Sequence, residues 1–166
     1  MDLRIGHGYD VHKFADVQEP GCTLTLGGVK VPHDRPLLAH SDGDVVIHAL
    51  CDAILGAIGA GDIGQHFPDT DPNFENIDSC LLLQSVINKA HEVGFRLVNA
   101  DLTVVAEAPR LAPHVNNMRD RLASIVGVAP SCLNVKATTT EGLGFPGRRE
   151  GLATHAVVLL SDNGAE

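Results

Sequence analysis

The sequence predicts an α+β fold, built as a single layered domain in which a mixed sheet packs against helices. Strand-like segments and segments with the helical 3.6-residue apolar period follow one another in the order β-ββ-α-α-β-α-β-β. The length of 166 residues suffices for one domain with a real core and is short for two. No repeat, low-complexity tract or linker divides the chain, so we predict one domain over residues 1–166.

Strands are expected first. Residues 3–12 are typical of a strand, and residues 23–31 are typical of a short hairpin that turns at Gly27 and Gly28. Residues 33–43 are expected to form a loop, which leads into the first helix.

Three helices are predicted, at about residues 43–58, 78–93 and 113–126. Each has apolar residues spaced for one buried face, and Gly94 and Gly127 end the second and third. Ser41 and Asp44 have the spacing of a capping pair at the start of the first helix. The Gly-, Asp- and Pro-rich segment from Gly59 to Asn76 predicts an ordered loop.

The remaining strands are expected at residues 95–107, 133–139 and 151–161. The last of these is apolar on both faces, and burial of both faces is unusual for a sheet in so small a domain. We therefore expect a partner subunit to cover one face.

Composition excludes several classes of function. Twelve basic and twenty-one acidic residues give a net charge of −9, which argues against a surface for nucleic acid or anionic membranes. No apolar run approaches the roughly 20 residues of a membrane span, and no signal sequence precedes the first strand, so we expect a cytoplasmic protein. The cysteines are widely separated without a Cys-x-x-Cys pair, which predicts small hydrophobic side chains without chemistry: Cys22, Cys51, Cys80 and Cys132.

Two motifs contain candidate metal ligands. Asp10 and His12 lie two residues apart on a strand, so they share a face and could bind one zinc ion. Taken alone, the pair is better explained by a surface strand with polar residues alternating outward. In the segment 40–48, His48 follows Asp44 by one helical turn and would complete an Asp-His-His set with one open position, as in catalytic zinc sites. The alternative is a hydrogen-bonded core histidine.

Three further motifs have weaker signals. Residues 61–71 combine turn residues with carboxylates that could shape a substrate site. Residues 136–148 lead from a strand with three consecutive threonines into a glycine-rich loop, which could present amides, hydroxyls and Arg148 to phosphate oxygens. Residues 106–114 join a strand to a helix, and a plain connection explains them from spacing alone.

Together, in this order and spacing, these motifs resemble one family. The stretches GHGYDVH, LLAHSDGDV, GDIGQHFPDTD, AEAPR and NVKATTTEGLGF cover the chain from end to end. They are similar to the 2-C-methyl-D-erythritol 2,4-cyclodiphosphate synthases of the non-mevalonate pathway of isoprene biosynthesis.

The resemblance implies a phosphorus–oxygen lyase assembled as a cyclic homotrimer, with active sites between subunits. The implied reaction converts 4-diphosphocytidyl-2-C-methyl-D-erythritol 2-phosphate to the 2,4-cyclodiphosphate and releases CMP. One zinc ion per subunit and a magnesium or manganese ion with the substrate diphosphate are the implied cofactors. The resemblance leaves open whether an isoprenoid diphosphate occupies the trimer axis.

The resemblance also implies roles for individual residues. Asp10, His12 and His48 would hold zinc, Glu141 would help to hold magnesium, and His40 and Thr139 would stabilise the transition state. The methylerythritol phosphate part of the substrate would contact Ser41, Asp62, Ile63, Gly64, Phe67, Pro68, Asp69, Thr70 and Asp71. Asp10, His12 and His40 would contact the substrate as well. The cytidine and diphosphate part would contact Ala106, Glu107, Ala108, Pro109, Arg110, Leu111, Ala112, Thr138, Thr139, Thr140, Glu141, Phe145 and Arg148.

Three positions depart from the usual family pattern. Arg110 stands where lysine is common, Gly142 replaces a commonly basic residue, and Arg149 replaces a usual glycine. Two other functions fit the same motifs: a metal-dependent phosphohydrolase that activates water, and a non-catalytic trimeric binder of isoprenoid diphosphates.

Overall fold

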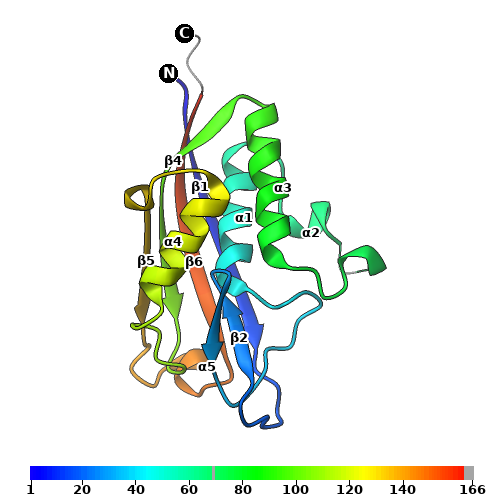
Figure 1. The fold of residues 1–166 in the computed structure, drawn as a ribbon, viewed down its shortest axis with the longest axis vertical. Coiled ribbons are helices and arrows are strands. Elements are labelled where there is room, and N and C mark those ends of the chain that lie inside the picture. Colours follow the sequence, from blue (N-terminus) through cyan, green and yellow to red (C-terminus); the bar gives the residue numbers. More distant parts are fainter. Residues whose placement is uncertain (69, 163–166) are drawn as a thin grey trace.

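A computed structural model describes residues 1–68 and 70–162, apart from the side chain of residue 73. Its centre is a mixed four-stranded sheet in the order β1-β6-β4-β5 (Figure 1). The strands span Leu3–Lys13 (β1), Phe95–Val105 (β4), Leu133–Thr138 (β5) and Gly151–Asp162 (β6). β6 is antiparallel to both of its neighbours, whereas β4 and β5 are parallel. A separate hairpin joins Thr23–Leu26 (β2) to Val29–Pro32 (β3).

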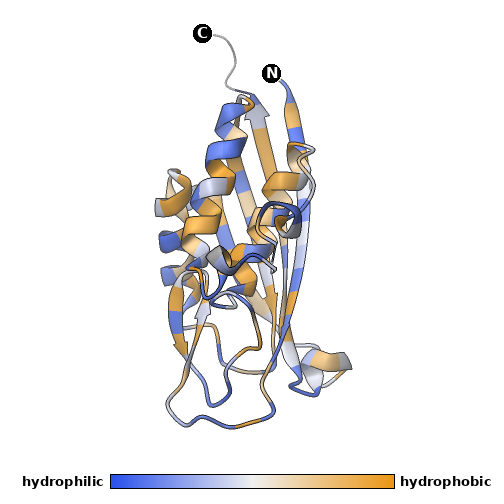
Figure 2. Cartoon of the chain, turned by 90° about the vertical axis from the view of Figure 1, so that its right-hand side faces the viewer, coloured by the Kyte–Doolittle hydropathy of each residue, from blue (hydrophilic) through white to orange (hydrophobic). Residues whose placement is uncertain are grey.

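Three longer helices pack on the same side of this sheet: Val45–Ala57 (α1), Ser79–Glu92 (α3) and Val115–Val126 (α4). α1 packs against β1 and β6, α3 packs beside α1, and α4 packs on β5. Figure 2 shows hydrophobic and hydrophilic stretches alternating along the helices, as expected for helices with one buried face. No helix in the described ranges is long and apolar enough to cross a membrane.

The contact between α1 and β1 is unusually close, because two glycines of β1 face the helix. A Cβ atom on Gly6 would lie 1.8 Å from the carbonyl oxygen of Ala53, and one on Gly8 would lie 1.9 Å from that of Ala49. Both positions therefore require glycine. The close packing holds His48, the neighbour of Ala49, beside the polar end of β1.

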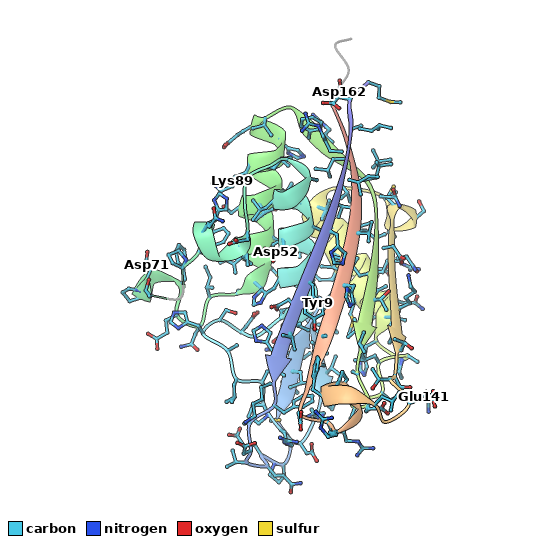
Figure 3. The ribbon with its side chains drawn as sticks, turned by 180° about the vertical axis from the view of Figure 1, so that it is seen from behind. Tyr9, Asp52, Asp71, Lys89, Glu141 and Asp162 are labelled. Carbon is cyan, nitrogen blue, oxygen red and sulfur yellow. The ribbon has the colours of Figure 1, made fainter. Side chains whose placement is uncertain are left out.

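The other face of the sheet is open in the single chain, and Tyr9 lies on it (Figure 3). On β6, the side chains that face the helices are buried, whereas His155 and Val157 on the opposite face are exposed. Ile5 and Tyr9 of β1 are 75% and 44% exposed. The second apolar face of β6 is therefore exposed at Val157, whereas Ala153 on the same face is buried, and burial of this face by a partner stays a prediction.

Most predicted elements are confirmed, and the differences lie at their ends. The first helix begins at Val45, because the Asp44 side chain itself accepts hydrogen bonds from the amides of Val46 and Ile47, so Ser41 is not its cap. The loop predicted at 59–76 contains a short helix, Ile63–His66 (α2), and a 3₁₀ turn, Pro72–Phe74 (η1). Short helices also occur at Pro130–Cys132 (η2) and Gly144–Gly147 (α5).

Candidate functional site

The predicted zinc ligands come together at one point. Asp10 Oδ2 lies 3.0 Å from His12 Nε2 and 3.1 Å from His48 Nδ1, and the two imidazole nitrogens are 3.1 Å apart. Asp10 and His12 project from the helix-covered face of β1, and His48 projects from the first turns of α1. His48 is 8% exposed, and the other two are half-buried.

This arrangement fits a zinc ion. Ligand atoms bound at about 2.0–2.1 Å in a tetrahedron lie roughly 3.3 Å from one another, close to the three separations in the structure. One carboxylate and two imidazoles are a typical donor set for a catalytic zinc, since three protein ligands leave a fourth position for substrate. Within the described residues, this is the one group of three such side chains close enough to share an ion.

The electrostatics of the cluster also suit a cation. Burial raises the pKa of Asp10, but hydrogen bonds from His12 and His48 outweigh it and bring the pKa down to about 2. Burial lowers the pKa of His12, but the hydrogen bond and the charge of Asp10 outweigh it and raise that pKa. The carboxylate therefore stays ionised at neutral pH and is available to a metal.

A cavity of about 230 Å³ adjoins this cluster and has room for part of a substrate. His12 and His48 form part of its wall, and His40 and Ser41, both predicted substrate contacts, also line it. Its other lining residues are apolar: Ile63, Phe67, Phe74, Ile77 and Leu82.

The loop 62–71 is only partly placed against this cavity. Ile63 and Phe67 line it, and the Ile63 amide donates to Asp52 Oδ1 at 2.7 Å, which anchors α2 to α1. Asp62 caps α2 by accepting a hydrogen bond from the Gln65 amide. Gly64 belongs to α2, and Pro68, Thr70 and Asp71 follow it along the loop, whereas Asp69 lies outside the described residues.

Polar groups that no sequence motif predicts surround the other nitrogen of His48. Ser79 Oγ lies 2.9 Å and Ser41 Oγ 3.2 Å from His48 Nε2, the nitrogen that points away from Asp10. Asp42 Oδ1 in turn lies 2.5 Å from Ser79 Oγ. Ser79 is the first residue of α3 and is distant in sequence from both partners, so only the tertiary structure reveals the contact.

The predicted cytidine and diphosphate residues form a second group at the end of β5. Glu107 Oε1 accepts hydrogen bonds from the amides of Thr140 and Gly142, both at 3.1 Å, and these bonds lower the pKa of Glu107. The segments 106–112 and 138–142 are therefore held together. They surround a cavity of about 430 Å³ that is lined by Ala106, Glu107, Pro109, Arg110, Leu111, Ala112, Ala137, Thr138 and Thr139.

Two predicted contacts lie elsewhere. Phe145 in α5 lines a different cavity, together with His12, Val11 and Lys13. Arg148 forms an ion pair with Glu150, with Nε 2.9 Å from Oε1. Glu141 accepts a hydrogen bond from Thr139 Oγ1 at 3.3 Å, so the predicted magnesium ligand and one predicted catalytic residue are neighbours.

The two groups lie at opposite edges of the sheet. Asp10 pairs with Thr154, Thr154 with Val104, and Val104 with Ala137, which precedes Thr139 by two residues. Three strand spacings of about 4.8 Å put β1 and β5 roughly 14 Å apart. Figure 3 shows Asp71 and Glu141 on opposite sides of the chain. The zinc group (Asp10, His12 and His48) and the threonine loop (Thr138 to Glu141) therefore lie apart in one chain: His12 and His48 line the cavity of about 230 Å³, whereas Thr138 and Thr139 line the cavity of about 430 Å³. Of the predicted cytidine and diphosphate contacts, Phe145 shares a cavity with His12.

Comparisons with known proteins agree on one family. Residues 3–161 match the YgbB family. The 2-C-methyl-D-erythritol 2,4-cyclodiphosphate synthase of Thioalkalivibrio sulfidiphilus is 57% identical over 159 residues, which are 96% of this chain and 97% of the relative. The synthase of Azotobacter vinelandii is 58% identical over 158 residues, 95% of this chain and 98% of the relative.

Solved structures with the same fold include IspF from Plasmodium falciparum in complex with CDP. It has a TM-score of 0.83 and 34% identity, and the match covers 96% of each chain. The bifunctional IspDF from Campylobacter jejuni has a TM-score of 0.91 and 44% identity over 97% of this chain. This chain spans 42% of that longer protein.

Proposed function

The chain belongs to the YgbB family, and we propose that it converts 4-diphosphocytidyl-2-C-methyl-D-erythritol 2-phosphate to 2-C-methyl-D-erythritol 2,4-cyclodiphosphate with release of CMP. As a member of this family it is an isoprenoid-pathway enzyme and a phosphorus–oxygen lyase. The observation that carries the specific reaction is the Asp10–His12–His48 cluster beside a cavity that contains two further predicted substrate contacts.

In the proposed reaction the substrate supplies its own nucleophile. An oxygen of the 2-phosphate forms a bond to the β-phosphorus, and the bond from that phosphorus to the bridging oxygen breaks, so CMP leaves with the electron pair. The protein's main task is therefore to fold the substrate so that its two ends meet and to balance its charge.

Each residue has a place in this proposal. Zinc held by Asp10, His12 and His48 would polarise the β-phosphate as a Lewis acid. Glu141 would contribute one carboxylate to magnesium or manganese, which otherwise binds substrate phosphates. His40 and Thr139 would donate hydrogen bonds to the charge that develops on the phosphoryl oxygens.

The remaining predicted contacts would bind the two ends of the substrate. Ser41 and the segments 62–64 and 67–71 would hold the methylerythritol phosphate. Segments 106–112 and 138–141 would hold the cytidine and diphosphate, with Phe145 and Arg148. The CDP bound in the Plasmodium falciparum relative supports a cytidine-linked substrate.

A cyclic homotrimer is part of the proposal, because one chain does not bring its two groups together. A head-to-tail contact would place the zinc group of one subunit beside the threonine loop of the next, three times around the ring. The exposed apolar residues of the open sheet face offer a surface for such packing. The cytoplasmic location and an isoprenoid diphosphate on the trimer axis stay predictions.

The test is turnover of the purified protein with the substrate and divalent metal, followed by ³¹P NMR. We expect CMP and the cyclic diphosphate to appear together at equal rates. A linear phosphate product would instead identify a phosphohydrolase, and binding without turnover would identify a non-catalytic binder.

Subunit sharing is tested with two impaired variants, His48→Ala and Thr139→Val, whose residual activities are measured first and which are then mixed under conditions that exchange subunits. Some interfaces of mixed trimers would pair an intact zinc group with an intact threonine loop, so activity should partly return. If mass spectrometry verifies exchange and no activity returns, each site belongs to a single chain.

A further inference from the structure

Two residues to which the proposed reaction assigns no role, Asp42 and Ser79, lie on the Nε2 side of the His48 ring. Asp42 lies in the loop before α1, and Ser79 is the fully buried first residue of α3. Ser79 Oγ is 2.5 Å from Asp42 Oδ1 and 2.9 Å from His48 Nε2. Two segments far apart in sequence, the loop that leads into α1 and the start of α3, thus meet at one side of the imidazole, opposite the Asp10 carboxylate.

The direction of these hydrogen bonds follows from the donors that each group has. An ionised carboxylate only accepts, so the Ser79 hydroxyl proton points to Asp42. Ser79 Oγ then has only lone pairs to offer to His48, and a hydrogen bond at 2.9 Å requires a proton on Nε2. Without that proton, two lone pairs would face each other. In the metal-free chain Nδ1 also faces an acceptor, Asp10 Oδ2 at 3.1 Å, so a metal ion bound there would take the place of the Nδ1 proton. The ring would then be neutral with its proton on Nε2 and with Nδ1 available as the metal ligand.

We propose that Asp42 and Ser79 are positioning residues that fix His48 as its Nε2–H tautomer and set the orientation of its ring, so that Nδ1 binds the metal. The inference rests on the proposed metal site and extends it beyond the three ligands. A carboxylate behind the ligand also makes the imidazole a stronger donor to the metal. Here the Ser79 hydroxyl lies between the Asp42 carboxylate and the imidazole and connects the two by hydrogen bonds.

The same two residues have a second, purely structural contact, which a well-chosen variant leaves intact. The Ser79 amide donates to Asp42 Oδ2 at 3.2 Å, and the Asp44 amide donates to Asp42 Oδ1 at 3.2 Å. Ser79→Ala removes the hydroxyl and keeps both amide contacts. It therefore separates orientation of His48 from attachment of α3 to the loop.

The experiment measures zinc affinity of the metal-free protein by competition with a chelator. Ser79→Ala should bind zinc about 10- to 100-fold more weakly than the parent, the range typical of lost outer partners of metal-bound histidines. The matched control is Asp78→Ala, which removes the cap of α3 at Cys80 but none of the His48 contacts. It should lower the melting temperature and leave zinc affinity unchanged.

A second readout detects the tautomer directly. In zinc-loaded protein with ¹⁵N-labelled histidine, long-range ¹H–¹⁵N spectra should show the His48 proton on Nε2, protected from exchange, and Ser79→Ala should lose that protection. A proton on Nδ1, or parental zinc affinity in Ser79→Ala, would overturn the proposal. His48→Ala distinguishes failure of the positioning role from failure of the metal site. If His48→Ala loses zinc and Ser79→Ala keeps parental affinity, only the positioning role is refuted. If His48→Ala retains zinc, the metal site itself is refuted.

Discussion

Replacing Gly8 by alanine tests whether the close approach of α1 to β1 builds the metal site. The added Cβ would lie 1.9 Å from the Ala49 carbonyl oxygen and 2.7 Å from the Ala53 amide nitrogen. Both are backbone atoms of a helix, so no side-chain rotation relieves the contact. The helix itself must move away from the strand.

The size of the effect follows from that distance. Ordinary contact begins at 3.4 Å, so α1 must retreat by about 1.5 Å near Ala49. Overpacking of this kind costs about 3 kcal/mol, which lowers the melting temperature of a chain this size by roughly 6–12 °C. Zinc sites tolerate ligand displacements of about 0.2 Å. A shift of α1 of this size would move His48 Nδ1 out of bonding distance of the metal, so zinc affinity should fall by more than roughly 100-fold.

The assays are chelator competition for zinc and thermal unfolding at matched protein concentration. Gly56→Ala is the control, because it lies in the same helix and an added Cβ there would meet nothing within 4 Å. It should raise stability by about 1 kcal/mol without changing zinc affinity. A Gly8→Ala protein with parental melting temperature and zinc affinity would refute the reasoning.

Three other predictions follow from the same structure. Thr139→Val and His40→Ala should each lower kcat by roughly one to three orders of magnitude with little change in melting temperature, since both residues are exposed; a large loss of stability with kcat intact would make them structural. Burial raises the pKa of the Cys80 thiol to about 11 and holds that of the Cys51 thiol well above its usual range. Replacing all four cysteines by alanine or serine should therefore leave the turnover of the folded protein within a few-fold. The lowered pKa of Asp10 stabilises the metal-free protein by about 2 kcal/mol above pH 4. That contribution is lost as the pH falls from about 4 to 2. Asp10→Asn should remove this part of the pH dependence of the free energy of urea unfolding.

The fold could be predicted where one local rule dominates. The strand at the N-terminus and the helix of 79–92 show clear periodicity, and both were placed within one or two residues. The short helix α2 was missed, because four residues carry no period and its anchor is the Asp52 carboxylate of another helix. The cap of α1 was misplaced for a similar reason, since Asp44 also accepts from the Gly27 and Gly28 amides of the β2–β3 turn.

Only the site residues that belong to local sequence motifs could be predicted. The spacing of Asp10 and His12 predicts a shared strand face, and the motif at 40–48 offers His48 as a third ligand. The resemblance to known synthases joins these motifs into one site. Ser79 had no comparable signal, because its role depends on the end of α3 lying against the loop that holds Asp42. The separation of the zinc group from Thr139 could not be predicted either, because no single segment determines the order of the strands in a mixed sheet.

An acidic chain can still offer a site to a highly phosphorylated substrate, because its nearby carboxylates are each held by donors. Asp44 accepts from four backbone amides, and Glu107 from two amides and the Thr140 hydroxyl. Asp42 accepts from two amides and the Ser79 hydroxyl, and Asp10 lies between two imidazoles. These donors stabilise the negative charge of each carboxylate locally, so the net charge of −9 does not by itself prevent a phosphorylated substrate from binding. The local field depends on the metal and on oriented amides, so removing a metal ligand should harm substrate binding more than removing a distant surface acid.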